Sequence, residues 1–179
     1  GIRVEAVCFI TPFFGPEKAQ AASRQLDVPL HVLDITEPHF EMLKKPRYGY
    51  GRYMNPCIDC HGLMFRQAGL LMEKTGARFL FSGEVLGERP MSQNKNSLRS
   101  VEKLSGCQGY ILRPLSALLL PETVPEREGL VDRNRLLAVH GRSRKPQIEL
   151  ARRFGITSYP EPAGGCRLTE PSGCGAKPS

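Results

Sequence analysis

Short apolar runs that alternate with helical patterns constrain the fold of this chain more than any other feature. Residues 4–10 form an apolar run rich in β-forming residues, and residues 30–35 and 78–82 form similar runs. Between the first two runs Pro16 opens a helix, because proline suits the first helical position. Strands that alternate with helices form parallel βαβ units. The sequence therefore predicts an α/β protein with a doubly wound, mainly parallel sheet.

The remaining predicted elements extend this pattern. Thr36 can cap a short helix that ends in Lys44 and Lys45, cations that suit a helix C-terminus. From Pro56 a longer helix carries apolar residues at helical spacing up to Gly76. A short strand is expected at residues 110–112, and helices are expected at residues 132–139 and 146–154.

The chain becomes proline-rich and then basic beyond residue 120. We therefore expect residues 1–120 to form an α/β nucleotide-binding domain. Residues 121–179 are expected to form a basic C-terminal extension, and one domain with an appended segment is ordinary for a chain of this length.

Composition limits the class of protein. Of the 179 residues, 40% are hydrophobic and 24% are charged, so the chain is long enough to bury a sizeable core. No apolar run approaches the roughly 20 residues that span a bilayer, and no secretion signal is recognisable, so we expect a soluble cytoplasmic protein without a membrane partner. The net charge of +7 favours a polyanionic partner such as a nucleic acid.

Two cysteines, Cys57 and Cys60, lie three residues apart where the longer helix is expected to begin. This spacing places both side chains on one face of the first turn. Amide N–H groups and the helix dipole at that end favour thiolate over thiol, so we expect the pair to be reactive or bound to a metal. A zinc knuckle completed by Cys166 and Cys174, or by His61, is the alternative.

A third cysteine, Cys166, follows Gly164 and Gly165. Two glycines let the backbone approach other groups closely, so a cysteine on this loop can meet the distant pair. Three thiolates can hold an iron–sulfur cluster with one iron open, and two of them can cycle between persulfide and disulfide. A glycine turn with a fortuitous cysteine is the alternative for this segment alone.

Ligands of a doubly wound sheet bind beyond the carboxyl ends of the strands, so the loops after the predicted strands are the candidate nucleotide sites. The loop at residues 82–93 follows the third strand, and its glycines suit close approach of a ligand. Its glycine spacing matches neither a Walker loop nor a dinucleotide fingerprint, so an ordinary surface loop is an equal alternative. The residues that we expect to bind the nucleotide are Thr11, Phe13, Gly83, Glu84, Gly87 and Arg89.

Basic residues gather in two stretches of the chain. The first stretch borders the cysteine pair and mixes cations with Tyr48, Tyr50 and Tyr53. Cations interleaved with aromatic rings suit phosphate contacts together with base stacking around an extruded nucleotide. A solvated basic face without a ligand is the alternative. The residues that we expect to contact RNA are Lys44, Lys45, Arg47, Arg52, Arg142, Arg144 and Lys145.

Five stretches between residues 48 and 169 together resemble the PP-loop ATP pyrophosphatases that thiolate tRNA uridines. This family includes the tRNA 2-thiouridine and 4-thiouridine synthetases. The stretches are Asn-Pro-Cys-Ile-Asp-Cys-His, Ser-Gly-Glu-Val-Leu-Gly-Glu-Arg-Pro-Met-Ser-Gln, Leu-Arg-Pro-Leu-Ser, Gly-Arg-Ser-Arg-Lys-Pro-Gln and Pro-Ala-Gly-Gly-Cys.

The resemblance implies an adenine nucleotide alpha hydrolase-like fold and a tRNA sulfurtransferase that uses ATP and Mg²⁺. ATP would adenylate a uridine carbonyl oxygen, and a sulfur nucleophile would then displace AMP. Cys60 matches the position of a catalytic cysteine in the 2-thiouridine enzymes, whereas Cys57 and Cys166 are additional, as in relatives with a three-cysteine cluster. The resemblance therefore favours a four-iron four-sulfur cluster on these cysteines over a persulfide relay, with sulfide or a cysteine desulfurase as sulfur donor.

The phosphate-binding signature of this family, Ser-Gly-Gly-x-Asp-Ser, is absent from the chain. In the relatives this signature follows the first strand, so we expect the first strand, loop and helix to be missing and the chain not to form a competent ATP site by itself. Two other functions remain open. One is a non-catalytic RNA-associated protein that holds zinc through Cys57, Cys60, Cys166 and Cys174, and the other is a different ATP-dependent sulfur- or amide-activating enzyme of the same fold.

Overall fold

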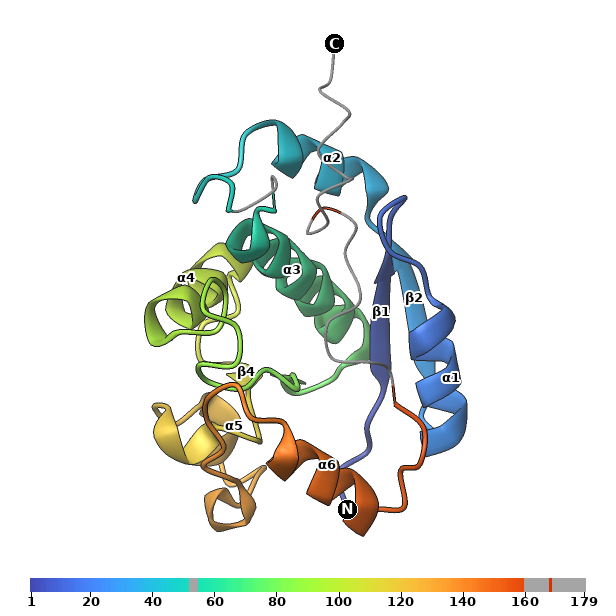
Figure 1. The fold of residues 1–179 in the computed structure, drawn as a ribbon, viewed down its shortest axis with the longest axis vertical. Helices are drawn as coiled ribbons and strands as arrows, with labels where there is room; N and C mark the ends of the chain where they lie inside the picture. Colours follow the sequence, from blue (N-terminus) through green and yellow to red (C-terminus); the bar gives the residue numbers. More distant parts are fainter. Residues whose placement is uncertain (52–54, 160–167, 169–179) are drawn as a thin grey trace. The chain divides into compact units, whose positions relative to one another are not determined.

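The computed structural model describes residues 1–51, 55–159 and 168 of the chain (Figure 1). The chain groups into two compact units, of which the first comprises residues 1–56 and 147–179 and the second comprises residues 57–146. In the described residues each unit contains one two-stranded parallel sheet. The fold is therefore mixed α/β with short parallel sheets. A doubly wound sheet of the PP-loop type and a domain boundary at residue 120 stay predictions.

The first unit is built on one βαβ crossover. Strands β1 (Ala6–Ile10) and β2 (Leu30–Asp34) pair in parallel over their whole length, and α1 (Glu17–Leu26) connects them. Asp27 ends α1 in the left-handed conformation with φ of 51°, which a short polar side chain tolerates. The strands predicted at residues 4–10 and 30–35, and the helix between them, are confirmed.

Helix α2 (Thr36–Lys44) follows β2 directly. Helix α2 begins at Thr36 itself, so Ile35 occupies the N-cap position, and the N–H group of Thr36 donates to Oδ1 of Asp34 at 2.8 Å. The predicted cap at Thr36 is therefore wrong, because Thr36 is the first residue of the helix and the residue before it has no side chain able to cap. On α2 the side chain of His39 is completely buried against the rings of Phe13 and Phe14, and each ring centroid lies 5.7 Å from that of His39.

The second unit combines two helices with a second pair of strands. Helix α3 (Cys57–Thr75) packs against α4 (Lys95–Ser105), and β3 (Leu80–Phe81) pairs in parallel with β4 (Ile111–Leu112). The long helix and the two short strands lie where the sequence predicted them. The buried apolar side chains of this unit include Ala68, Val85, Leu98, Val101, Ile111, Leu112 and Ala117.

Helix α4 was not predicted from the sequence. Asn94 caps it by accepting a hydrogen bond from the N–H group of Ser97 at 2.9 Å, and Gly106 ends it with φ of 76°. Between these ends Leu98, Val101 and Leu104 recur every three residues on one side of the helix, and Leu98 and Val101 are buried. The sequence therefore held a helical period with a cap at each end, and this signal was overlooked.

In its described residues, the chain after β4 forms short elements. These are η2 (Ala117–Leu119), α5 (Val124–Arg127), η3 (Arg133–Arg135) and α6 (Lys145–Arg153). Helix α6 confirms the helix predicted at residues 146–154. In the part of the chain that the structure describes, no helix has the length and apolar character needed to cross a membrane.

The helix predicted at residues 132–139 is wrong, because only the single turn of η3 forms there. The N–H groups of Leu137 and Val139 donate to the carbonyl groups of Pro114 and Leu115, at 3.0 and 2.7 Å. These backbone donors therefore pair with an earlier segment of the chain instead of forming helical hydrogen bonds.

Two glycines permit the close approach of α3 and α4. A Cβ atom at Gly62 would lie 2.6 Å from Cβ of Leu104, and a Cβ atom at Gly69 would lie 2.6 Å from Sγ of Cys107. Both distances are shorter than carbon and sulfur atoms can tolerate without a shift of the neighbour. The helices are thus packed at a distance that only glycine allows.

We expect Gly62→Ala to destabilise the chain by up to about 2 kcal/mol, because the added methyl group overpacks the contact with Leu104 at a cost of about 1–3 kcal/mol. The gain of about 1 kcal/mol that alanine brings to a helix interior offsets part of this cost. Urea unfolding measures the difference, and Leu70→Ala on the exposed side of α3 is the control, expected to stay within about 0.5 kcal/mol of the unchanged chain. A Gly62→Ala variant as stable as the unchanged chain would contradict this packing.

Candidate functional site

The cysteine pair lies at the start of α3. Because α3 begins at Cys57, both Cys57 and Cys60 belong to its first turn, and both side chains are half-buried. The N–H groups of a first turn have no acceptor within the helix, so they and the helix dipole favour a negatively charged sulfur there. The predicted placement of the two cysteines on a helix start is confirmed, and their reactivity stays a prediction.

The metal-binding hypotheses depend on residues beyond this pair. Within the described residues, no three His, Cys, Asp or Glu side chains are close enough together to hold a metal ion. Cys166 and Cys174, which the cluster and zinc hypotheses require, lie outside the described residues. At the start of α3 the described residues therefore place two thiols together, and a third ligand stays a prediction.

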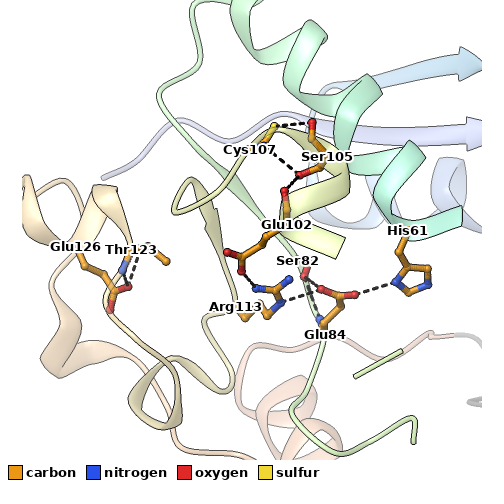
Figure 2. Close-up of polar contacts among 9 residues, drawn as sticks. All are labelled: His61, Ser82, Glu84, Glu102, Ser105, Cys107, Arg113, Thr123 and Glu126. Atoms are coloured by element: carbon orange, nitrogen blue, oxygen red, sulfur yellow. Dashed lines mark hydrogen bonds and ion pairs between the residues drawn. The ribbon is translucent and has the colours of Figure 1, made fainter. Parts of the chain in front are cut away.

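One buried carboxylate, that of Glu84, connects the start of α3 to the ends of β3 and β4 (Figure 2). Its Oε1 lies 2.9 Å from Nδ1 of His61, the residue after Cys60. Its Oε2 accepts a hydrogen bond from Nε of Arg113 at 2.9 Å and one from the hydroxyl of Ser82 at 3.2 Å. Glu84 is 8% exposed and Arg113 is 3% exposed, so water hardly competes for these contacts.

The surroundings of Glu84 fix its charge. Burial raises the pKa of Glu84, but the hydrogen bond from His61 and the charge of Arg113 together lower it by more, so the pKa lies below the ordinary value of 4.5. Glu84 is therefore ionised at neutral pH. Because an ionised carboxylate only accepts hydrogen bonds, Nδ1 of His61 carries the proton in this contact.

Arg113 extends the network to α4. Its Nη1 donates to Oε1 of Glu102 at 2.6 Å, so the guanidinium group lies between two carboxylates. Its Nη2 is buried and has no hydrogen-bond partner among the described residues, which is uncommon for a buried donor. Arg113 thus joins α4 to the loop after β3, and its unpaired Nη2 group lies near the carboxyl ends of the strands.

The loop after β3 lies against a later segment of the chain. The hydroxyl of Ser116, which is completely buried, accepts from the N–H group of Leu86 at 2.9 Å and donates to the carbonyl of Val139 at 2.6 Å. The N–H group of Gly141 donates to the carbonyl of Leu86 at 2.8 Å. Gly87 has φ of 79°, and a Cβ atom there would lie 3.5 Å from the backbone nitrogen of Gly141, so glycine suits this turn.

This contact brings two sets of predicted site residues together. Oε1 of Glu88 in the loop lies 3.5 Å from Nη1 of Arg144 in the later segment. Arg142 and Lys145 beside it are exposed, as are Gly83 and Arg89 in the loop. Predicted nucleotide-binding and RNA-binding residues therefore adjoin within the second unit.

The other predicted nucleotide-binding residues belong to the first unit. The hydroxyl of Thr11 accepts a hydrogen bond from the N–H group of Phe13 at 3.1 Å. The ring of Phe13 packs against His39 and Phe40. Phe13 therefore packs against α2, and its contact with a nucleotide stays a prediction.

The first basic stretch is exposed but partly neutralised. Lys44 pairs with Glu41 through Nζ and Oε1 at 2.6 Å, and the exposed hydroxyl of Tyr50 donates to the carbonyl of Leu43. Lys45 and Arg47 are exposed, whereas Arg52 and Tyr53 lie outside the described residues. Exposed cations and rings suit both an RNA contact and a solvated face, so the RNA contact stays a prediction.

Sequence reasoning did not identify Arg113 and Ser116 as parts of the site. Both lie in the stretch Leu-Arg-Pro-Leu-Ser that directly follows β4. The available signal was an arginine placed immediately after a buried strand, where a guanidinium group needs a carboxylate partner. The partner itself, Glu84, is 29 residues away along the chain and has no local signature.

Comparisons of this chain with models of known protein families, with curated proteins and with solved structures found no match. The argument for a function therefore rests on the cysteine pair and on the contacts of Glu84.

We expect the burial of His39 to make the first unit less stable in mildly acidic solution. Burial lowers the pKa of His39 below 6.5, so the unfolded chain takes up a proton at higher pH than the folded chain does. The free energy of unfolding should then fall as pH decreases through 6.5, by up to about 1.4 kcal/mol per pH unit. Denaturant unfolding between pH 8 and pH 5, chosen to bracket the roughly 6.5 pKa of an unperturbed histidine, measures this slope.

The variant His39→Gln tests the assignment, because glutamine does not titrate. It should flatten the slope, whereas His140→Gln, which replaces an exposed histidine, should leave the slope unchanged. Equal slopes in the unchanged chain and in His39→Gln would assign the pH dependence to another group.

Proposed function

We propose that this chain belongs to an ATP-dependent tRNA sulfurtransferase that thiolates a uridine. The observation that carries the proposal is the link between the cysteine-bearing turn of α3 and the loop after β3, made by His61 and Glu84 at 2.9 Å. Ligands of parallel α/β sheets bind at the carboxyl ends of the strands, where this loop lies. A sulfur nucleophile and a nucleotide would therefore act within one unit.

The proposed reaction has two steps. A uridine carbonyl oxygen attacks the α-phosphorus of ATP, with Mg²⁺ on the phosphates, and pyrophosphate leaves. Adenylation converts the oxygen into a good leaving group, so a sulfur atom carried at the cysteine pair can then attack the ring carbon while AMP leaves with the oxygen. Sulfide would replace the sulfur that each cycle consumes, whereas persulfide sulfur from a cysteine desulfurase would also require a two-electron reductant such as a thiol pair.

The two described thiols suit an iron–sulfur cluster chemically. Thiolate sulfur is the usual ligand of such clusters, and Cys57 and Cys60 offer two of them within one helical turn. Cys166 would be the third ligand, and three protein ligands leave one iron open to hold an additional sulfur. Burial raises the pKa of the Cys8 and Cys107 thiols, so these two are poorer candidates.

The basic segment beside the loop supports a tRNA substrate. Arg142 and Lys145 are exposed, and Arg144 is half-exposed. The N–H group of Gly141, just before them, donates a hydrogen bond to the carbonyl of Leu86 in the loop after β3. Phosphate groups next to the target uridine would meet these cations. With tRNA as substrate, the proposed place of action is the cytoplasm.

We expect the protein purified without oxygen to be brown and to contain iron and acid-labile sulfide. Cys57→Ala and Cys60→Ala should each lose most of the iron, because removing one of three ligands weakens the cluster. In a protein that also carries the phosphate-binding segment, both variants should lose thiolation, measured by mass spectrometry of tRNA nucleosides after incubation with ATP, Mg²⁺ and sulfide.

The control is Cys8→Ala, which removes a half-buried thiol of β1 and should keep both iron and activity. A colourless protein with stoichiometric zinc and no thiolation in any condition would favour a zinc-holding RNA-binding module instead.

We expect the triple variant Arg142→Ala, Arg144→Ala and Lys145→Ala to bind tRNA more weakly. Losing up to three phosphate contacts should flatten the dependence of log affinity on log salt by about 0.7 to 0.9 per contact. Affinity should fall equally for all tRNAs, because phosphate contacts do not read bases. Filter binding over a range of salt concentrations measures both effects.

The matched control carries the same loss of charge elsewhere in the second unit, through Lys74→Ala, Arg78→Ala and Lys103→Ala, all exposed positions. If both triple variants weaken binding to the same extent, net charge explains the result and the proposed RNA-binding segment is wrong.

A further inference from the structure

Three structural elements meet at one carboxylate in the second unit. From this arrangement we propose that Glu84 is a positioning residue, which holds the cysteine-bearing first turn of α3 against the carboxyl ends of β3 and β4. The importance of this link for sulfur transfer rests on the proposed function, whereas the link itself rests on the contacts of Glu84 alone.

The contacts of Glu84 leave little capacity for a ligand. Oε1 is engaged by His61, and Oε2 is engaged by both Arg113 and Ser82 (Figure 2). The residue is 8% exposed. Its carboxylate therefore acts as a bridge within the protein, which differs from the direct nucleotide contact that the sequence predicted.

The first turn of a helix needs such support. Helix ends fray, because their terminal N–H groups lack acceptors within the helix. His61 lies on that turn directly after Cys60, and its ring is held at Nδ1 by a carboxylate that Arg113 fixes in turn. Fixing His61 therefore limits how far Cys60 can move relative to the loop after β3.

The position of the sulfur matters for the proposed reaction. Reacting atoms must approach to roughly 3–3.5 Å in the correct direction, and a misplacement of about 1 Å can slow a reaction on the order of 100-fold. Glu84 would thus influence the rate of the reaction without touching the reacting atoms.

The experiment measures how readily Cys57 and Cys60 are alkylated by iodoacetamide in the whole chain, reduced and treated with a chelator, with each site followed by mass spectrometry. The test variants are Glu84→Gln, His61→Ala and the double variant. The control is Glu126→Gln, another buried carboxylate paired with an arginine, which bonds Thr123 at the start of α5 and has no tie to α3 (Figure 2).

We expect alkylation of Cys57 and Cys60 to rise about tenfold in each single test variant, the change that follows from losing one hydrogen bond to a charged group. Alanine is a better helix former than histidine, so a rise in His61→Ala cannot come from lower helix propensity. The double variant should react no faster than the faster single variant, because each single substitution already breaks the same contact between His61 and Glu84. Glu126→Gln should leave the alkylation rates unchanged, although it also loses stability.

Unchanged alkylation in His61→Ala, or an equal rise in Glu126→Gln, overturns the proposal. Glu84→Gln also weakens the pairing of the buried Arg113, so His61→Ala decides the matter if Glu84→Gln does not fold. Where the chain thiolates tRNA, Glu84→Gln should lower kcat and leave KM for tRNA nearly unchanged. If no thiolation occurs even when the phosphate-binding segment is supplied, the proposed function fails, while the alkylation rates still decide the role of Glu84.

Discussion

The guanidinium group of Arg113 is the charge on which the arrangement of the second unit depends. It is 3% exposed and lies between the carboxylates of Glu84 and Glu102, at 2.9 and 2.6 Å. Removing one partner of a buried ion lowers the stability of the folded protein by about 3–5 kcal/mol. The folded state is therefore stable only while both carboxylates stay beside Arg113. The loop after β3 and helix α4 are consequently fixed to the end of β4 by contacts for which water hardly competes.

Helix packing makes this network geometrically possible. Gly62 of α3 allows Leu104 of α4 to approach closely, and Nη2 of Arg66 donates to the carbonyl of Leu104 at 2.7 Å across the same interface. Glu102 lies two residues before Leu104 on α4, and His61 lies directly before Gly62 on α3. The close contact between α3 and α4 therefore sets the positions from which Glu102 and His61 reach Arg113 and Glu84. Helix packing and polar contacts stabilise the same placement of α3 against α4.

The parts of the fold that could be predicted have strong local signals. Residues 4–10 and 30–35 are apolar runs beside proline and glycine, and both form strands. The helix predicted at residues 132–139 does not form, because backbone N–H groups there pair with Pro114 and Leu115, and such long-range pairing leaves no local pattern. Helix α4, in contrast, has Leu98, Val101 and Leu104 at helical spacing between a capping asparagine and a terminal glycine, so its signal was present in the sequence and was overlooked.

The candidate site divides in the same way. The placement of Cys57 and Cys60 followed from their spacing and from a helix start, both of which are local. The role of Glu84 did not follow, because its partners His61 and Arg113 are 23 and 29 residues away, one before it and one after it. From the sequence alone, a glutamate in a glycine-containing loop indicates a ligand contact. In the structure, both carboxylate oxygens of Glu84 are hydrogen-bonded to side chains of the protein. The first turn of α3, which carries both cysteines, is therefore joined to the ends of β3 and β4 by a residue that no local pattern marks.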